Sequence, residues 1–97
     1  MNITIRNGEE RDFETIFSLI KEFSIFQRTP EKVMITLEEM RQNKNLFQCF
    51  VAETESNAIV GFASFFFGYY SWSGKAIYLD DLYVNENSRG QNIRPLA

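Results

Sequence analysis

Apolar and polar residues recur along this chain with two different periods, and the change of period divides the chain into elements. From about Glu10 to about Phe26 the apolar residues recur at spacings of three and four, which predicts a helix with one buried face. Backbone before proline disfavours the helical region, so Thr29-Pro30 should break this helix. The apolar stripe consists of Phe13, Ile16, Phe17, Ile20 and Phe23.

The remaining pattern predicts four strands and one shorter helix. Thr36 followed by Glu39 is a capping box, which predicts a helix from Thr36 to about Gln42. Runs rich in β-branched and aromatic residues, separated by turn residues, are typical of strands. Such runs are Ile3–Arg6, Phe47–Glu53, Ala58–Tyr69 and Ala76–Val84, with a loop at 55–57 and a turn at Gly74. The order β-α-α-β-β-β predicts a mixed α/β (α+β) fold with a mostly antiparallel sheet.

Composition narrows the choice of domain number and partner. Its 97 residues allow one domain, 1–97, with a modest core rich in phenylalanine, of which there are 10. A net charge of −3 does not fit a nucleic-acid binder, which needs a basic face. No apolar stretch approaches the ~20 residues of a membrane span. We therefore expect neither a nucleic-acid nor a membrane partner.

The chain has one cysteine, Cys49, and no histidine. A single cysteine excludes an intrachain disulfide, and the lack of histidine excludes Ser-His and Cys-His nucleophilic schemes. Cys49 alternates with Phe47 and Val51 on one strand face, as a small core residue would. No metal-ligand spacing occurs, so we expect no metal. A reduced, cytoplasmic compartment is the simplest expectation.

Two adjacent carboxylates, Asp80 and Asp81, interrupt an apolar strand. Strands usually exclude aspartate, and an unpartnered buried carboxylate is unfavourable. The two-residue period of a strand sends the two side chains to opposite faces, which does not fit a paired acid/base dyad. Two interpretations remain open. One carboxylate takes a proton or holds a cationic amine, or both are satisfied by neighbouring backbone amides.

Aromatic residues and a glycine turn supply further candidates. We expect Phe65 and Phe67 to lie in the core. Trp72 falls in a hairpin loop, where it has less reason to be buried and could form a substrate wall. Arg89-Gly90-Gln91-Asn92 is either an ordinary turn or the start of a phosphate-binding helix N-terminus.

Taken in order, these segments resemble the GNAT acyltransferases, and within them the diamine (spermidine/spermine-type) N-acetyltransferases. The resemblance rests on Ile3-Thr-Ile-Arg6 with Asp12 and Leu19-Ile-Lys-Glu22, on Ala52-Glu53 with Ile59-Val-Gly-Phe-Ala63, and on Trp72-Ser-Gly-Lys75 leading through Tyr78-Leu-Asp-Asp-Leu-Tyr-Val84 to Arg89-Gly90.

The resemblance implies transfer of an acetyl group from acetyl-coenzyme A to a primary amine of a small or polyamine-like substrate. Asp80 would take the place of a family glutamate that removes the proton of the amine through water. Positions that contact the substrate would be Asp81, Trp72, Phe26 and Gln27. Phe26 and Gln27 fall where relatives carry a tyrosine and a glutamate, and Tyr70 falls where a relative has an acidic residue. These departures weaken the expected preference for polyamines.

The cofactor would be held along the last strand and the loop after it. By resemblance, the backbone of Leu82, Tyr83 and Val84 would hold the pantetheine arm and the thioester carbonyl. The pyrophosphate would be cradled by Arg89, Gly90, Gln91, Asn92, Ile93 and Arg94. Asn92 and Arg94 depart from the family pattern, which has small residues at both positions.

The similarity covers essentially the whole chain but only about the first half of a family domain. The pyrophosphate helix and the tyrosine that usually protonates the thiolate would lie beyond it, as expected for an interrupted or frame-shifted reading of a longer gene. We therefore expect little turnover, and a homodimer or higher assembly that covers the edge of the last strand. The alternative is a non-catalytic fragment or interaction module that is stable as an oligomer.

Overall fold

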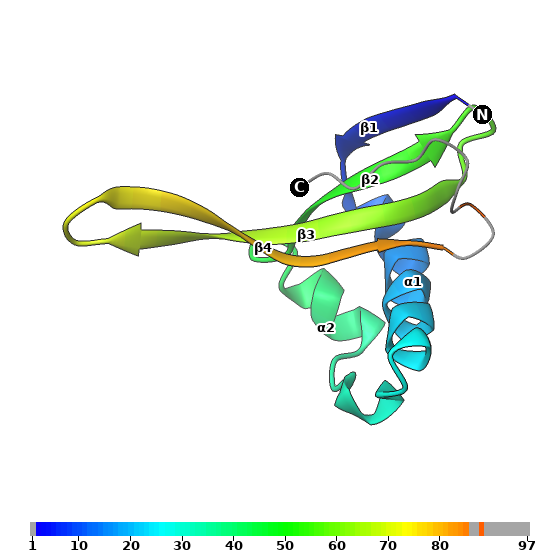
Figure 1. Ribbon diagram of the computed structural model, residues 1–97, viewed down its shortest axis with the longest axis horizontal. Helices are drawn as coiled ribbons and strands as arrows, with labels where there is room; N and C mark the ends of the chain where they lie inside the picture. Colours follow the sequence, from blue (N-terminus) through cyan, green and yellow to red (C-terminus); the bar gives the residue numbers. More distant parts are fainter. Residues whose placement is uncertain (1, 86–87, 89–97) are drawn as a thin grey trace.

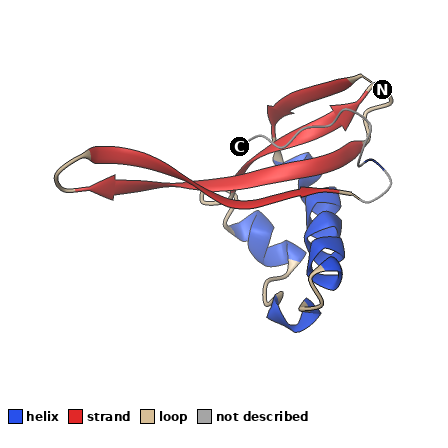
Figure 2. Ribbon diagram, viewed as in Figure 1, coloured by secondary structure: helices blue, strands red, loops and turns tan. Residues whose placement is uncertain are grey.

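The computed structural model describes residues 2–85 and residue 88, and its elements follow the predicted order (Figures 1 and 2). The elements are β1 (Ile3–Asn7), η1 (Glu10–Asp12), α1 (Phe13–Phe26), η2 (Pro30–Lys32), α2 (Leu37–Gln42), β2 (Gln48–Thr54), β3 (Ile59–Tyr70) and β4 (Gly74–Val84). The short segments η1 and η2 are 3-10 turns that precede the α-helices. The predicted mixed fold is confirmed.

The four described strands form one antiparallel sheet in the order β1-β2-β3-β4. Both helices lie on the same side of this sheet (Figure 2). The distal halves of β3 and β4 extend well beyond the helices as a two-stranded hairpin (Figure 1). Strand pairing is regular except at two register shifts, at Ala52/Glu53 and at Ser64/Phe65.

The core lies between α1 and the sheet. Ile16 of α1 and Val51 of β2 are its fully buried side chains, and Met40 brings α2 into the same cluster. Cys49 is 4% exposed, which confirms its predicted place in the core. The buried thiol lies among apolar groups, and burial raises the pKa of Cys49 to about 11.

Local hydrogen bonds define the ends of the helices. The predicted capping box of α2 is confirmed, because the Thr36 hydroxyl accepts the Glu39 N–H and the Glu39 carboxylate accepts the Thr36 N–H, both at 3.1 Å. At the end of α1, Thr29 N–H donates to Ser24 C=O at 2.8 Å and Arg28 N–H donates to Ile25 C=O at 2.9 Å. This pair of bonds is a Schellman motif, and it places Arg28 at φ 60°. The helix thus ends by its own C-terminal motif just before the predicted proline break.

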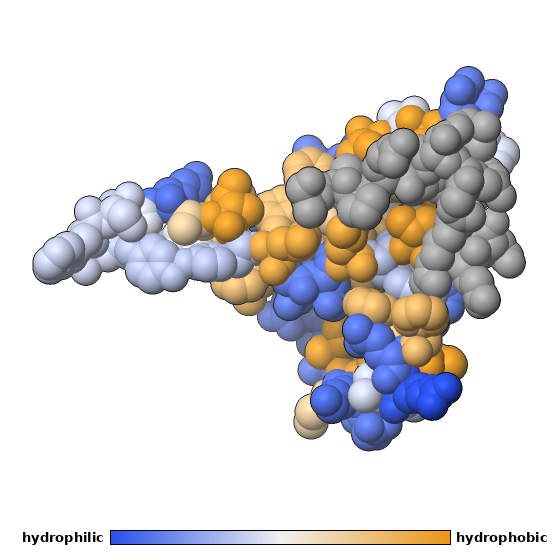
Figure 3. Space-filling model, viewed as in Figure 1, coloured by the Kyte–Doolittle hydropathy of each residue, from blue (hydrophilic) through white to orange (hydrophobic). Residues whose placement is uncertain are grey.

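The prediction that Phe65 and Phe67 belong to the core is wrong. Alternation along β3 places them on the face opposite Phe62, which packs under the helices. Together with Phe50 and Leu79 they line an apolar groove of about 520 Å³ on the helix-free face. Figure 3 shows apolar side chains exposed between the projecting hairpin and the rest of the molecule. The sequence does not show which face of the sheet the helices cover. The apolar character of Phe65 and Phe67 therefore could not decide whether they are buried.

Candidate active site

A β-bulge in β4 places Asp80 and Asp81 together. Ser64 of β3 pairs with Asp81 and Phe65 pairs with Leu79, so Asp80 is an extra residue opposite this step. Both carboxylates line one cavity on the helix side of the sheet. The predicted placement on opposite faces is therefore wrong, because the bulge interrupts the period of two at that position.

The cavity has a volume of about 410 Å³ and lies between the end of α1, the segment from η2 to α2, and the middle of β4. Apolar side chains such as Phe23 and Phe47 form part of its wall. Its polar side chains include Gln27 after α1, Lys32 in η2 and the aspartates of β4, together with the hydroxyls of Ser24, Thr29 and Ser64. The fold thus brings together an acidic edge, an amide and an ammonium group.

Asp81 is half-buried, and Asp80 is exposed. Burial raises the pKa of the Asp81 carboxyl group, and the neighbouring charge of Asp80 raises this pKa further. Among the residues that the structure describes, neither aspartate forms an ion pair. The Asp81 N–H donates to the Ser64 hydroxyl at 3.2 Å, which fixes the backbone of the bulge and leaves the carboxylate to the cavity. Because burial disfavours the charged form of Asp81, an incoming cation would stabilise its carboxylate.

The backbone of Leu82, Tyr83 and Val84, for which a cofactor role is expected, alternates between the two sides of β4. Asn85 N–H donates to Val60 C=O at 2.8 Å, and the direction of backbone groups alternates along an antiparallel strand. The N–H and C=O of Leu82 therefore point away from β3, toward the outer side of β4. No other strand of the described part of the chain pairs with that side. An outward amide beside a carboxylate can receive a thioester carbonyl and stabilise an oxyanion.

Tyr83 fixes β4 to α1. Its ring is 4% exposed and stacks on Phe23 with ring centroids 4.9 Å apart. Its hydroxyl donates to the carboxylate of Glu22 on α1. The pairing of a strand tyrosine with a helix glutamate 61 residues earlier in the chain has no local signal, so sequence reasoning missed it.

The other predicted substrate contacts are only partly brought together. Gln27 lines the cavity with the aspartates. Phe26 is exposed and is not among the residues that line the cavity, although it lies next to Gln27. Trp72 is 99% exposed at the tip of the β3–β4 hairpin. The rise of a strand places it roughly 20–25 Å along β4 from Asp81. Within one copy of the chain, Trp72 therefore does not form a wall of this cavity.

The predicted pyrophosphate loop, Arg89, Gly90, Gln91, Asn92, Ile93 and Arg94, lies outside the described residues. The chain that leads to it is described as far as Asn85. There, Ser88 N–H donates to the Asn85 side-chain oxygen at 3.0 Å and to its backbone C=O at 3.1 Å. These two bonds hold Ser88 next to Asn85, at the end of β4.

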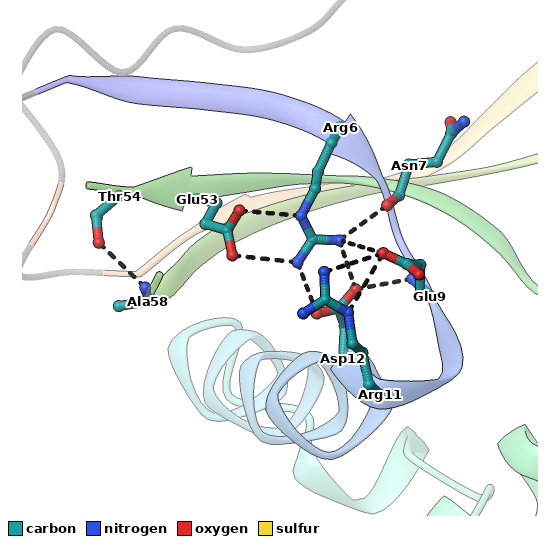
Figure 4. A network of polar contacts seen from close by, with 8 residues as sticks. All are labelled: Arg6, Asn7, Glu9, Arg11, Asp12, Glu53, Thr54 and Ala58. Carbon is teal, nitrogen blue, oxygen red and sulfur yellow. Dashed lines mark hydrogen bonds and ion pairs between the residues drawn. The ribbon is translucent and has the colours of Figure 1, made fainter. Parts of the chain in front are cut away.

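A second polar cluster lies at the opposite end of α1, where its hydrogen bonds and ion pairs hold elements of the fold together (Figure 4). Arg6 of β1 donates to both carboxylate oxygens of Asp12, at 2.8 and 2.9 Å, and to Glu53 of β2 at 3.0 Å. Asp12 also accepts the Glu9 N–H at 2.8 Å. The Arg6 hydrogen bonds lower the pKa of Asp12, which is 6% exposed. This cluster joins two strands to the start of α1, and all its charges are paired.

Two kinds of site are absent from the part of the chain that the structure describes. No group of three or more metal-binding side chains occurs there. None of its helices is long and apolar enough to cross a membrane. The acidic cavity combines two carboxylates that have no ion pair among the described residues with a concave shape.

Comparison with known proteins gives this site a context. A model of the acetyltransferase (GNAT) family matches residues 10–93, a range that includes both aspartates. Thialysine N-epsilon-acetyltransferase of Sus scrofa is 31% identical over 95% of this chain, and that of Mus musculus is 32% identical over 92%. The chain spans 61% and 59% of these two relatives. A spermidine/spermine N(1)-acetyltransferase-like protein of Homo sapiens is 32% identical over 92% of the chain, which spans 14% of it.

Solved structures show the same architecture. An aminoglycoside acetyltransferase from an uncultured soil metagenomic sample, in complex with sisomicin, superposes with a TM-score of 0.71 at 27% identity, covering 92% of this chain and 60% of that one. An acetyltransferase of Clostridium acetobutylicum with acetyl-CoA superposes with a TM-score of 0.72 at 24% identity, covering 95% and 66%. At that identity, the second likeness shows the fold alone.

Proposed function

Because the chain belongs to the acetyltransferase (GNAT) family, we propose that it carries the amine site and part of the acetyl-coenzyme A site of an N-acetyltransferase. The substrate class is a primary amine on a small molecule, as the names of the thialysine and spermidine/spermine relatives indicate for those proteins. The observation that supports this most is the pair of unpaired carboxylates in a cavity beside an outward strand amide.

Asp80 is the proposed base. An alkylammonium group has no lone pair and cannot attack a thioester, so a proton must leave the amine first. Asp80 faces the cavity from the bulge and accepts this proton through a water molecule, because aspartate is one methylene shorter than glutamate. The amine nitrogen then forms the new N–C bond while the C–S bond of the acetyl thioester breaks. The nitrogen loses its second proton, and the departing coenzyme A thiolate takes up a proton from water.

Asp81 is the proposed binding carboxylate. It is more buried than Asp80 and has no ion pair among the described residues, so an incoming ammonium group would supply its missing partner. Gln27 and Phe26 belong to the same end of α1 and would contact the carbon chain of the substrate. The outward N–H of Leu82 would receive the negative charge that develops on the acetyl oxygen. The backbone of Val84, which points to the same side of β4, would continue along the pantetheine arm.

Calorimetry with acetyl-coenzyme A tests the cofactor site of this chain. Micromolar binding supports a working site. No heat at millimolar ligand would favour the alternative, a non-catalytic interaction module, because the described residues and residues 89–94 together would then fail to hold the cofactor.

The base is tested by the substitution Asp80→Asn, which keeps the shape and removes the proton acceptor. Acetylated amine is measured by mass spectrometry, which detects the low turnover expected of this chain. We expect a loss of about 10²–10⁴-fold in rate. Glu38→Gln, an exposed acid on α2 outside the cavity, is the matched control and should keep the parent rate. Equal rates for Asp80→Asn and the parent would remove Asp80 from the mechanism.

We also propose that the protein works as a homodimer or higher assembly, in the cytoplasm. The helix-free face exposes the apolar side chains of Phe50, Phe67, Ile77 and Leu79, which a second copy would cover. No described strand pairs with the outer side of β4, which offers a second copy a strand edge. A free cysteine fits a reducing compartment. Light scattering that returned a compact monomer at high concentration would contradict the assembly.

A further inference from the structure

Ser64 is a buried hydroxyl group in the wall of the acidic cavity. It lies on the helix side of β3, two residues after Phe62, and is 4% exposed. It lines the cavity together with Asp80 and Asp81. A hydroxyl on an apolar strand face loses its hydrogen bonds to bulk water, which is unfavourable unless other partners replace them. Each hydrogen-bonding group of Ser64 therefore requires a partner.

The protein supplies a partner for the oxygen of this hydroxyl but not for its hydrogen. A serine hydroxyl can accept hydrogen bonds and also donate one. The Ser64 oxygen accepts the Asp81 N–H at 3.2 Å, whereas its hydrogen is donated to none of the described residues. Ser24 is a second buried serine in the same wall, but its hydroxyl donates to Lys21 C=O at 2.7 Å. The hydrogen of Ser64 is thus left to the cavity.

The two carboxylates lie where a water molecule can join them to this hydrogen. Ser64 and Asp81 are paired directly across the two strands, so their side chains share a face, with Cβ atoms about 4.5–5.5 Å apart. Asp80 is the extra residue of the bulge at the same step. A buried water typically makes about three hydrogen bonds to polar groups and needs room. The hydroxyl, the two carboxylates and a cavity of about 410 Å³ meet both conditions.

We propose that the Ser64 hydroxyl holds a water molecule against the two aspartates, and that the proton of the substrate amine passes through this water. The proposal rests on the proposed function and adds Ser64 to it as a positioning residue. Ser64 donates to the water oxygen, and the two water hydrogens are donated to Asp80 and Asp81. One lone pair of the water oxygen remains, and it accepts an N–H of the incoming ammonium group.

The proton transfer regenerates the water. The ammonium proton moves to the water oxygen while a water hydrogen moves to the carboxylate of Asp80. The amine thereby gains the lone pair that attacks the thioester carbon. The hydrogen bond from Ser64 keeps the water oxygen turned toward the amine and its hydrogens turned toward the carboxylates.

High-resolution crystal structures of the 97-residue chain and its variants test the water site without any acetyl transfer. We expect a water within about 2.5–3.0 Å of the Ser64 hydroxyl oxygen and of a carboxylate oxygen. Ser64→Ala should lose this water. Ser24→Ala removes a buried hydroxyl from the same wall, but its hydrogen is already donated to α1, so the water should remain. A parent structure without the water, or a Ser64→Ala structure that retains it, would overturn the proposal.

Rates at two pH values separate proton transfer from a purely structural effect on the bulge. Acetylated amine is measured by mass spectrometry for the parent, Ser64→Ala and Ser64→Thr. At about pH 7, Ser64→Ala should lower kcat about fivefold to tenfold, the effect of one neutral hydrogen bond, with little change in KM for the amine. The deficit should shrink toward about pH 9.5, because more of the amine is then already deprotonated. Ser64→Thr keeps a hydroxyl and should restore most of the rate.

Parent and variants share the charged side chains that line the cavity, Lys32, Asp80 and Asp81, so the titration of these groups affects all of them alike. A deficit of equal size at both pH values would overturn the proton-transfer role, because a distorted bulge lowers the rate whatever the charge of the amine. An unchanged rate for Ser64→Ala would overturn it as well. A water at Ser64 in a parent that forms no acetylated product would instead leave the water site intact and contradict the proposed function.

Discussion

The cluster around Arg6 allows a stability prediction with a defined pH dependence. The perturbation is Asp12→Asn, which is nearly isosteric and removes one charge. In the parent, Asp12 accepts two Arg6 hydrogen bonds at 2.8 and 2.9 Å and the Glu9 N–H at 2.8 Å. Asparagine has one acceptor oxygen in place of two, and its NH2 group would face the Arg6 donors.

The expected loss is about 2–3 kcal/mol in the free energy of unfolding. A hydrogen bond to a charged group contributes about 1.5–3 kcal/mol, and breaking a fully buried pair removes about 3–5 kcal/mol. Asp12 is 6% exposed, but Arg6 retains Glu53 as a partner at 3.0 Å, so its charge is not left alone. The expected loss therefore lies at the lower edge of the range for breaking a fully buried ion pair.

The sign of the pH dependence follows from the lowered pKa of Asp12. The Arg6 hydrogen bonds lower this pKa in the folded protein, so the carboxylate stabilises the fold above the ordinary Asp pKa of about 3.9. That contribution disappears as the pH falls through the lower, folded-state pKa. The gap in stability between parent and Asp12→Asn should be constant from about pH 7 to about pH 5 and narrow below about pH 4.

Urea denaturation followed by circular dichroism at several pH values measures this gap. Glu55→Gln is the control, because Glu55 is exposed and accepts one long bond, from Asn2 N–H at 3.3 Å. It should change stability by less than about 0.5 kcal/mol. A loss below about 0.5 kcal/mol for Asp12→Asn, or a gap that does not narrow in acid, would refute the assigned role of the ion pair.

Two further predictions concern the backbone and the thiol. Arg28 lies at φ 60°, where glycine is unstrained, so Arg28→Gly should stabilise the fold by about 0.5–1 kcal/mol in urea denaturation. Asn57→Gly, at φ 67°, should stabilise the fold by less, because asparagine tolerates this backbone region. A lower stability of Arg28→Gly than of the parent would contradict the assignment of the helix end. Cys49, with its pKa raised to about 11, should react with a thiol reagent at pH 8 at least about 100-fold faster in urea than in the folded protein, and equal rates would contradict its burial.

The sequence was a good guide wherever the deciding interactions are local. The stripe from Phe13 to Phe23 and the Thr36 capping box depend on residues three or four positions apart, and both elements formed as predicted. The same holds for the strand meander and its turn at Gly74, with φ 82°. The family resemblance, carried by ordered motifs, was also confirmed.

Part of the site could not be predicted because it depends on partners distant in the chain. The bulge at Asp80 is a mismatch between two paired strands, and neither strand encodes it alone. The Tyr83–Glu22 contact and the place of Lys32 in the same cavity as the aspartates depend on how α1 and η2 lie relative to β4. The exposure of Phe67 depends on which face the helices cover.

The sequence by itself thus determined the order of the elements, their capping signals and the family, because periodicity and motifs act over neighbouring residues. The tertiary structure alone decided that Asp80, Asp81, Gln27 and Lys32 surround one cavity while Trp72 lies far from it. The physical reason is that a single extra residue in a strand reverses the face of every side chain after it. Only the register with the neighbouring strand fixes where that residue is placed.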